Sequence, residues 1–191
     1  MTKLAIFASG SGSNAEKIIE YFSENKNISV DLILTNNPKA GVIDRAKKYQ
    51  IPVVLFDKKT FIETNKIVQL LDNQGISLII LAGFLWLIPE NLVKKFPNKI
   101  INIHPALLPK YGGKGMWGHR VHEAVVANNE TESGITIHFV NENYDEGNII
   151  FQAKCAILPT DSPEDVAAKV LKLEHEFFPK IIEKLVMRLA V

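Results

Sequence analysis

An amide and an imidazole stand two residues apart at the end of an apolar stretch, and they are the first candidates for chemistry in this sequence. Asn102 and His104 alternate with isoleucines over residues 100–103, a pattern typical of a buried strand that Pro105 then ends. Because side chains alternate across a strand, Asn102 and His104 share one face. Such a pair is typical of an active-site edge, where it can donate hydrogen bonds and move a proton. Two polar residues paired at a strand terminus would look the same, and that alternative stays open.

A glycine-rich loop over residues 10–14 is the second candidate. It lies between an apolar run, residues 3–8, and a helical pattern. The spacing of its glycines matches the dinucleotide fingerprint G-x-G-x-x-A, but no acidic residue ends the second strand at residues 35–37, where one would bind ribose hydroxyls. Glycines and a helix N-terminus together favour a monophosphate site, because backbone N–H groups can approach the anion. A dinucleotide site and a purely structural turn stay open.

The remaining polar candidates are weaker. His119 and His122 are three residues apart on a predicted helix, but no third ligand is spaced to join them, so we predict no metal site. His138 lies among apolar neighbours in a predicted strand, and we interpret it as a hydrogen-bonded packing residue. Asp145 lies in a polar loop, and spacing alone does not show that it reaches His104.

Length and composition limit the classes of protein. The 191 residues are 47% hydrophobic and 23% charged, values of an ordinary globular chain, and we expect a single domain over residues 1–191. A net charge of +1 argues against a nucleic-acid surface. Cys155 is the one cysteine; we interpret it as a small buried hydrophobe, and it fits a reducing compartment. The apolar run 78–88 is too short to span a bilayer and no signal-peptide pattern is present, so we expect a cytoplasmic protein.

Strand and helix patterns alternate along the chain, which predicts an α/β fold with an open, mostly parallel twisted sheet and helices on both faces. The predicted strands cover residues 3–8, 28–34, 52–56, 78–82 and 99–104. The predicted helices follow the glycine loop (apolar positions from 15 to 22) and cover residues 41–49, 60–75 (with Thr60 as its cap), 89–96 and 119–128. The last elements are an antiparallel strand pair, 134–140 and 148–157, and a long helix, 163–189, that Pro179 kinks or splits. Ligands bind beyond the carboxyl ends of such strands, so the glycine loop, Asn102 and His104 should share one rim.

Five segments of the sequence carry a family resemblance. They are S-G-S-G-S-N at 9–14, L-A-G-F at 81–84, N-I-H-P-A-L-L-P-K-Y at 102–111, G-I-T-I-H-F-V at 134–140 and D-E-G at 145–147. Together, and in this order, they resemble the phosphoribosylglycinamide formyltransferase family, the folate-dependent glycinamide ribonucleotide transformylases of purine biosynthesis. The resemblance runs nearly end to end and implies a formyltransferase, Rossmann-like fold.

The resemblance also implies a reaction. The amine of glycinamide ribonucleotide attacks the formyl carbon of 10-formyltetrahydrofolate, its co-substrate, through a tetrahedral intermediate and without a metal. The family's catalytic residues match Asn102, His104 and Asp145. Donors aimed at the developing oxyanion are worth about 3–4 kcal/mol each in such sites. His104 would relay the proton from the amine to the leaving folate nitrogen, and a carboxylate beside it would raise its pKa.

Matches for substrate-binding residues follow from the same resemblance. The phosphate loop matches Gly12, Ser13 and Asn14, and the acidic residue that holds the glycinamide end matches Glu174. The folate pocket should involve Leu85, Trp86, Leu87, Ile88, Asn102, Asn141, Glu142, Asn143, Tyr144 and Asp145. Some relatives have a basic residue where this chain has Trp86, and the resemblance assigns a folate contact to neither Lys58 nor Lys59. The glycines of segment 112–118 suggest a mobile flap over the site.

Two alternatives accompany the transferase hypothesis. The first is a 10-formyltetrahydrofolate hydrolase, which would release formate whether or not an amine is present. The second is a non-catalytic folate- or nucleotide-binding module on the same fold. The resemblance implies small-molecule substrates only, with no nucleic acid or membrane partner, for a monomer or homodimer.

Overall fold

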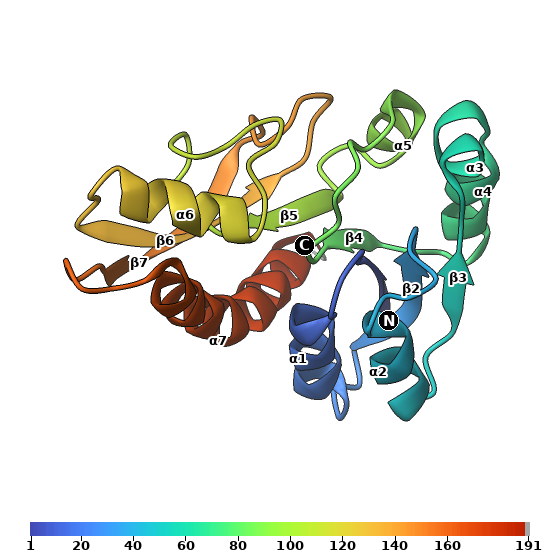
Figure 1. The fold of residues 1–191 in the computed structure, drawn as a ribbon. Helices are drawn as coiled ribbons and strands as arrows, with labels where there is room; N and C mark the ends of the chain where they lie inside the picture. Colours follow the sequence, from blue (N-terminus) through green and yellow to red (C-terminus); the bar gives the residue numbers. More distant parts are fainter. Residues whose placement is uncertain (190–191) are drawn as a thin grey trace.

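The computed structural model describes residues 1–189 and contains one seven-stranded sheet with helices on both faces (Figure 1). The strands are β1 (Thr2–Phe7), β2 (Ile28–Thr35), β3 (Val53–Leu55), β4 (Leu78–Leu81), β5 (Ile100–His104), β6 (Glu132–Phe139) and β7 (Ile149–Ala156). The helices are α1 (Ser13–Phe22), α2 (Val42–Lys48), α3 (Lys58–Glu63), α4 (Lys66–Asn73), α5 (Glu90–Lys95), α6 (His119–Ala127) and α7 (Pro163–Leu189). No helix among these residues is long and apolar enough to cross a membrane.

The strand order is β3-β2-β1-β4-β5-β6-β7, and the first five strands are parallel. The predicted fold class is confirmed, with one addition. The pair β6–β7 is antiparallel as predicted, and the pair β5–β6 is antiparallel as well. The reason is that β6 begins at the same end of the sheet at which β5 ends. This pairing sets Asn102 opposite His138 and His104 opposite Thr136.

Two apolar cores, one on each face of the sheet, explain the strand and helix patterns. One core packs α1, α2, α6 and α7 against the sheet through fully buried side chains such as Ile6, Ile33 and Phe178. The other packs α3, α4 and α5 against the opposite side of the same strands through Phe7, Phe61 and Leu71. Central strands buried on both faces need continuous apolar sequence, and β4 has it, with all four residues buried. The sheet therefore holds the carboxyl ends of β4 and β5 in fixed positions.

Two of the predicted helices differ from the structure. The single helix predicted over 60–75 is two helices, α3 and α4, because the backbone is extended at Thr64 between them. The cap of α3 is Asp57 and not Thr60: the Asp57 carboxylate accepts from the Thr60 N–H at 2.6 Å. Pro179 does not split α7, which continues through it to Leu189.

Candidate active site

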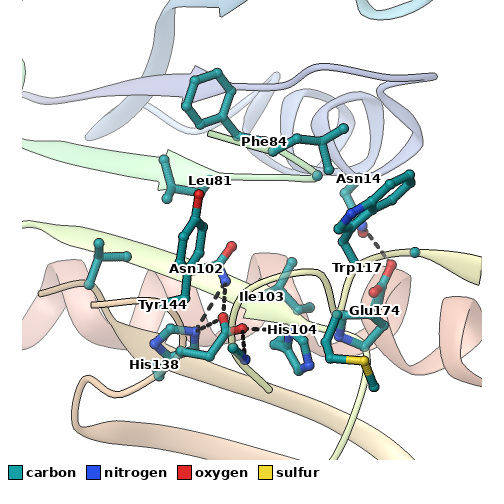
Figure 2. Close-up of a pocket in the computed structure, with 18 of the residues that line it drawn as sticks. Asn14, Leu81, Phe84, Asn102, Ile103, His104, Trp117, His138, Tyr144 and Glu174 are labelled. Carbon is teal, nitrogen blue, oxygen red and sulfur yellow. Dashed lines mark hydrogen bonds and ion pairs between the residues drawn. The ribbon is translucent and has the colours of Figure 1, made fainter. Parts of the chain in front are cut away.

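A cavity of about 520 Å³ opens at the carboxyl end of β5 (Figure 2). The lining comes from Asn14 at the start of α1, the end of β4 and the segment after it, the end of β5, segment 113–119 with His122 of α6, the end of β6 and the loop after it, and one side of α7. This is where an open α/β sheet binds ligands. As predicted, Asn102, His104 and Asn14 of the glycine loop lie on one rim, and Asp145 joins them from the loop after β6.

Asn102 is held by two neighbours that fix the direction of its amide. Its Nδ2 lies 3.1 Å from Nε2 of His138 and 3.4 Å from Oδ1 of Asp145. Nδ1 of His138 lies 2.8 Å from the carbonyl oxygen of Phe139, which only accepts, so that nitrogen carries the hydrogen and Nε2 accepts from Asn102. The second amide hydrogen is donated to Asp145, but this contact is long and therefore weak, so a ligand oxygen can compete for that hydrogen.

His138 corrects the interpretation from sequence, which treated it as a packing residue. It is 2% exposed and hydrogen-bonded, as expected, but it lines the cavity and also lies 3.5 Å from Oδ1 of Asp145. Its role in orienting Asn102 depends on the β5–β6 register. A strand-period pattern shows which face a residue shares with its own neighbours, but not which residue faces it on the next strand.

His104 lies between a carbonyl and a carboxylate. Its Nε2 donates to the backbone oxygen of Tyr111 at 2.7 Å, and its Nδ1 faces Oδ2 of Asp145 at 3.5 Å. Tyr111 has a positive φ of 57°, and its hydroxyl donates to Glu130, which also pairs with Lys110. These contacts anchor the carbonyl that accepts from Nε2. Nδ1 is therefore the ring nitrogen left to take up a proton.

Burial dominates the electrostatics of His104. The ring is 3% exposed, and burial lowers its pKa below the ordinary value for histidine, although Asp145 and the Tyr111 carbonyl raise it. The carboxylate raises the pKa of His104 as expected, but the cost of desolvating the imidazolium outweighs this effect, so the net pKa is lowered. The ring is neutral at neutral pH and is ready to accept a proton.

Asp145 stays ionised at the centre of this group. Burial raises the pKa of its carboxyl. Three neighbours lower that pKa by more: His138, His104 and the backbone N–H of Gly113, which donates to Oδ2 at 2.9 Å. The net pKa is therefore below the usual value for Asp. Its φ of 57° is in the left-handed region, which Asp tolerates better than most residues. A Cβ at Gly147 would lie 1.7 Å from the carbonyl oxygen of Phe139, so this close return of the loop requires glycine.

One end of the cavity is apolar. Eight of the ten residues predicted for a folate pocket line the cavity. Besides Asn102 and Asp145 these are Leu85, Trp86, Leu87, Ile88, Asn143 and Tyr144. The other two, Asn141 and Glu142, lie outside its lining. Phe84 and Trp86 belong to a cluster of aromatic rings that includes Phe56 and Phe61. This end suits a flat aromatic ligand.

The other end of the cavity is polar. Nδ2 of Asn14 donates to Oε2 of Glu174 at 2.7 Å, which joins the glycine loop to α7 across 160 positions of sequence (Figure 2). Gly12 and Ser13 lie just outside the cavity lining, at the start of α1. Gly12 has a φ of 76°, and a Cβ there would lie 2.6 Å from Val42, so the tight loop depends on this glycine. A phosphate at this helix N-terminus stays a prediction.

Several candidates from the sequence lie elsewhere or were missed. Cys155 is half-buried on β7, away from the cavity, where burial raises the pKa of its thiol. Met116, Trp117 and His122 line the cavity, although sequence reasoning gave none of them a ligand-binding role. The mobility of segment 112–118 stays a prediction. Among residues 1–189, no three His, Cys, Asp or Glu side chains gather as a metal site.

Glu174→Gln is expected to stabilise the protein at alkaline pH. Burial raises the pKa of the Glu174 carboxyl to about 6, and the Asn14 hydrogen bond opposes this only in part. The stability that the neutral carboxyl gives is present below pH 4.5 and is lost as pH rises through about 6. Glutamine stays neutral and can still accept from Asn14, so its free energy of unfolding at pH 8 should exceed that of wild type by about 2 kcal/mol.

Urea denaturation of both proteins between pH 4 and pH 8 measures this difference. The other carboxyl groups titrate in both proteins, so their contributions to the free energy of unfolding cancel in the difference between the two. A difference that does not change with pH would mean that Glu174 does not titrate in this range.

The comparisons with known proteins agree with this geometry. The formyl transferase family model matches residues 2–182. A phosphoribosylglycinamide formyltransferase of Bacillus subtilis is 38% identical over 192 residues, covering 97% of this chain and 95% of its own. The chloroplastic phosphoribosylglycinamide formyltransferase of Arabidopsis thaliana is 42% identical over 94% of this chain, which spans only 64% of that relative's length. The crystal structure of phosphoribosylglycinamide formyltransferase from Bacillus halodurans superposes with a TM-score of 0.87 at 35% identity, covering 97% of this chain and 95% of its own.

The fold and the family model agree, and the chain belongs to the formyl transferase family. Within it, the relatives and the solved structure named above are phosphoribosylglycinamide formyltransferases, as the sequence resemblance predicted.

Proposed function

We propose that this chain transfers the formyl group of 10-formyltetrahydrofolate to the amine of glycinamide ribonucleotide, a step of purine biosynthesis. The meeting of Asn102, His104 and Asp145 between an apolar and a polar end of one cavity is the observation that carries the proposal. The relatives' names support the same reaction. The single cysteine supports a reducing compartment such as the cytoplasm.

The reaction begins when the amine nitrogen attacks the formyl carbon. A C–N bond forms, and the carbonyl π electrons move to the oxygen, which becomes an oxyanion. The amide hydrogen of Asn102 that makes only the long contact with Asp145 is donated to this oxygen instead and stabilises it. One such donor is worth about 3–4 kcal/mol, because it is already oriented before the charge develops.

His104 moves the proton that this attack releases. Neutral before attack, it takes the proton from the amine at Nδ1, and the Asp145 carboxylate 3.5 Å away stabilises the resulting imidazolium. When the intermediate collapses, the bond between the formyl carbon and N10 of the folate breaks. N10 takes the electron pair and receives the proton back from His104, so the charges balance.

The folate occupies the apolar end of the cavity in this proposal, with its ring system among Leu85, Trp86, Ile88 and Tyr144. The amine substrate enters from the polar end, with its phosphate at the start of α1 and its glycinamide near Glu174. The two substrates then meet at His104, which lies between the two ends (Figure 2).

One assay separates this function from its alternatives. The protein is incubated with 10-formyltetrahydrofolate, with and without glycinamide ribonucleotide, and both formylated product and formate are measured. Transfer predicts product and little formate. Formate release that ignores the amine would show a hydrolase, and the absence of both products would leave a binding module.

A further inference from the structure

One imidazole that lines the cavity makes no hydrogen bond to any residue that the structure describes. His122, on α6, is only 5% exposed, and within the described residues its Nδ1 is buried without a hydrogen bond. Buried polar atoms in proteins are almost always paired. The mechanism above makes no use of this ring. Nδ1 is closed off, so no ligand reaches it, whereas Nε2 also has no hydrogen bond among residues 1–189 but is not closed off, which makes it the ring atom that a ligand in the cavity can reach.

The surroundings of His122 determine which kind of ligand fits. From α7, three apolar residues (Ala167, Val170 and Leu171) line the cavity, together with Glu174, whose Oε2 already accepts from Asn14. Burial lowers the pKa of His122 to about 4, with contributions from His119 and His104, so the ring is neutral at neutral pH. A neutral ring does not compensate a phosphate charge, but it does suit an uncharged hydroxyl group.

The hydrogen of the neutral ring belongs on Nε2. A buried N–H without an acceptor is rarer in proteins than an under-satisfied acceptor, and Nδ1 has no acceptor. Nε2–H is then the group available to the cavity, as a hydrogen-bond donor.

The position of His122 selects a part of the amine substrate. Gly118, which directly precedes α6, and Glu174, the partner of Asn14, line the same cavity, and α6 packs against the helix α7 that carries Glu174. His104 is close enough to lower the pKa of His122. A substrate whose phosphate lies at the glycine loop and whose amine lies at His104 places its ribose between the two.

We propose that Nε2–H of His122 donates to a ribose hydroxyl of the amine substrate. This inference deepens the proposed function and rests on it. The residue acts on binding and takes no part in proton transfer.

The test compares two replacements at His122 in steady-state kinetics. His122→Phe keeps a flat ring but has no donor, and we expect the KM for glycinamide ribonucleotide to rise about tenfold, the effect of one hydrogen bond. His122→Gln can place its amide near the position of Nε2, and we expect its KM to lie closer to wild type. The KM for 10-formyltetrahydrofolate should stay within about twofold in both variants. Glu123→Gln, an exposed neighbour on α6, serves as the matched control.

A substrate analogue with 2′,3′-dideoxyribose completes the test. If the ring binds a ribose hydroxyl, the phenylalanine variant and wild type should bind this analogue equally well. An unchanged KM for glycinamide ribonucleotide in the phenylalanine variant would overturn the inference while the proposed function stands. A lower melting temperature with higher KM values for both substrates would show a structural role instead. An inactive wild-type protein would overturn the proposed function and this inference with it.

Discussion

Replacing His104 with alanine is expected to lower kcat by about three orders of magnitude. General acid–base groups contribute about 10²- to 10⁴-fold, and His104 is asked both to take the amine proton and to return it to N10. Neither Asp145 nor Asn102 can replace it, because the first is an ionised carboxylate with a low pKa and the second does not titrate. The loss should appear in single-turnover measurements, where product release does not limit the rate.

Folding has to be measured alongside turnover, since the ring is buried. The cavity left by His104→Ala adjoins the binding cavity and can fill with water, so we expect a cooperative melting transition and retained folate binding. His175→Ala, on α7 and outside the cavity lining, is a suitable control and should keep turnover within about twofold of wild type. Near-normal kcat in a folded His104→Ala protein would remove His104 from the mechanism.

Much of the fold could be predicted from the sequence because its signals are local. The alternation of apolar runs and helical patterns places every strand of the sheet, and the continuous apolar sequence of β4 predicts burial on both faces. The effects of Thr64 and Pro179 on their helices could not be predicted from local sequence. Whether a residue ends a helix at such a position depends on what the rest of the helix packs against, and the long contact of α7 with the first core keeps it continuous through Pro179.

The catalytic group could be predicted only in part. Asn102 and His104 share a face because they belong to one strand, which strand periodicity shows. Asp145 lies 41 positions after His104, and family resemblance rather than spacing brought it to the site. His138 and His122 were missed as site residues because their positions depend on the β5–β6 register and on the packing of α6 against α7.

The electrostatics of the site depend on burial, which the sequence does not give. A carboxylate beside a histidine favours the charged ring, and this term is visible once Asp145 is placed near His104. The opposing cost of desolvating the ring depends on how much protein surrounds it. With His104 only 3% exposed, the desolvation term is the larger, and the net pKa is lowered instead of raised.

Asp145→Asn is expected to lower kcat by about 10²-fold with little change in either KM. The carboxylate stabilises the imidazolium that forms on His104, so its charge matters in the transition state more than in the ground state. Asparagine has nearly the same shape and tolerates the left-handed backbone at this position. It can keep the contact with the Gly113 N–H through its side-chain oxygen. The variant therefore removes the charge with little effect on the loop.

The pH dependence of this variant tests the electrostatic role directly. His104 must be neutral to accept a proton, so the acid limb of kcat/KM reports its pKa in the free enzyme. The Asp145 charge raises that pKa, and without it only the Tyr111 carbonyl opposes the effect of burial, so the acid limb should move to lower pH in Asp145→Asn. Ionisation of the amine substrate affects both proteins equally and cancels in the comparison. If the acid limb stays in place and only a KM changes, Asp145 binds substrate and does not assist proton transfer.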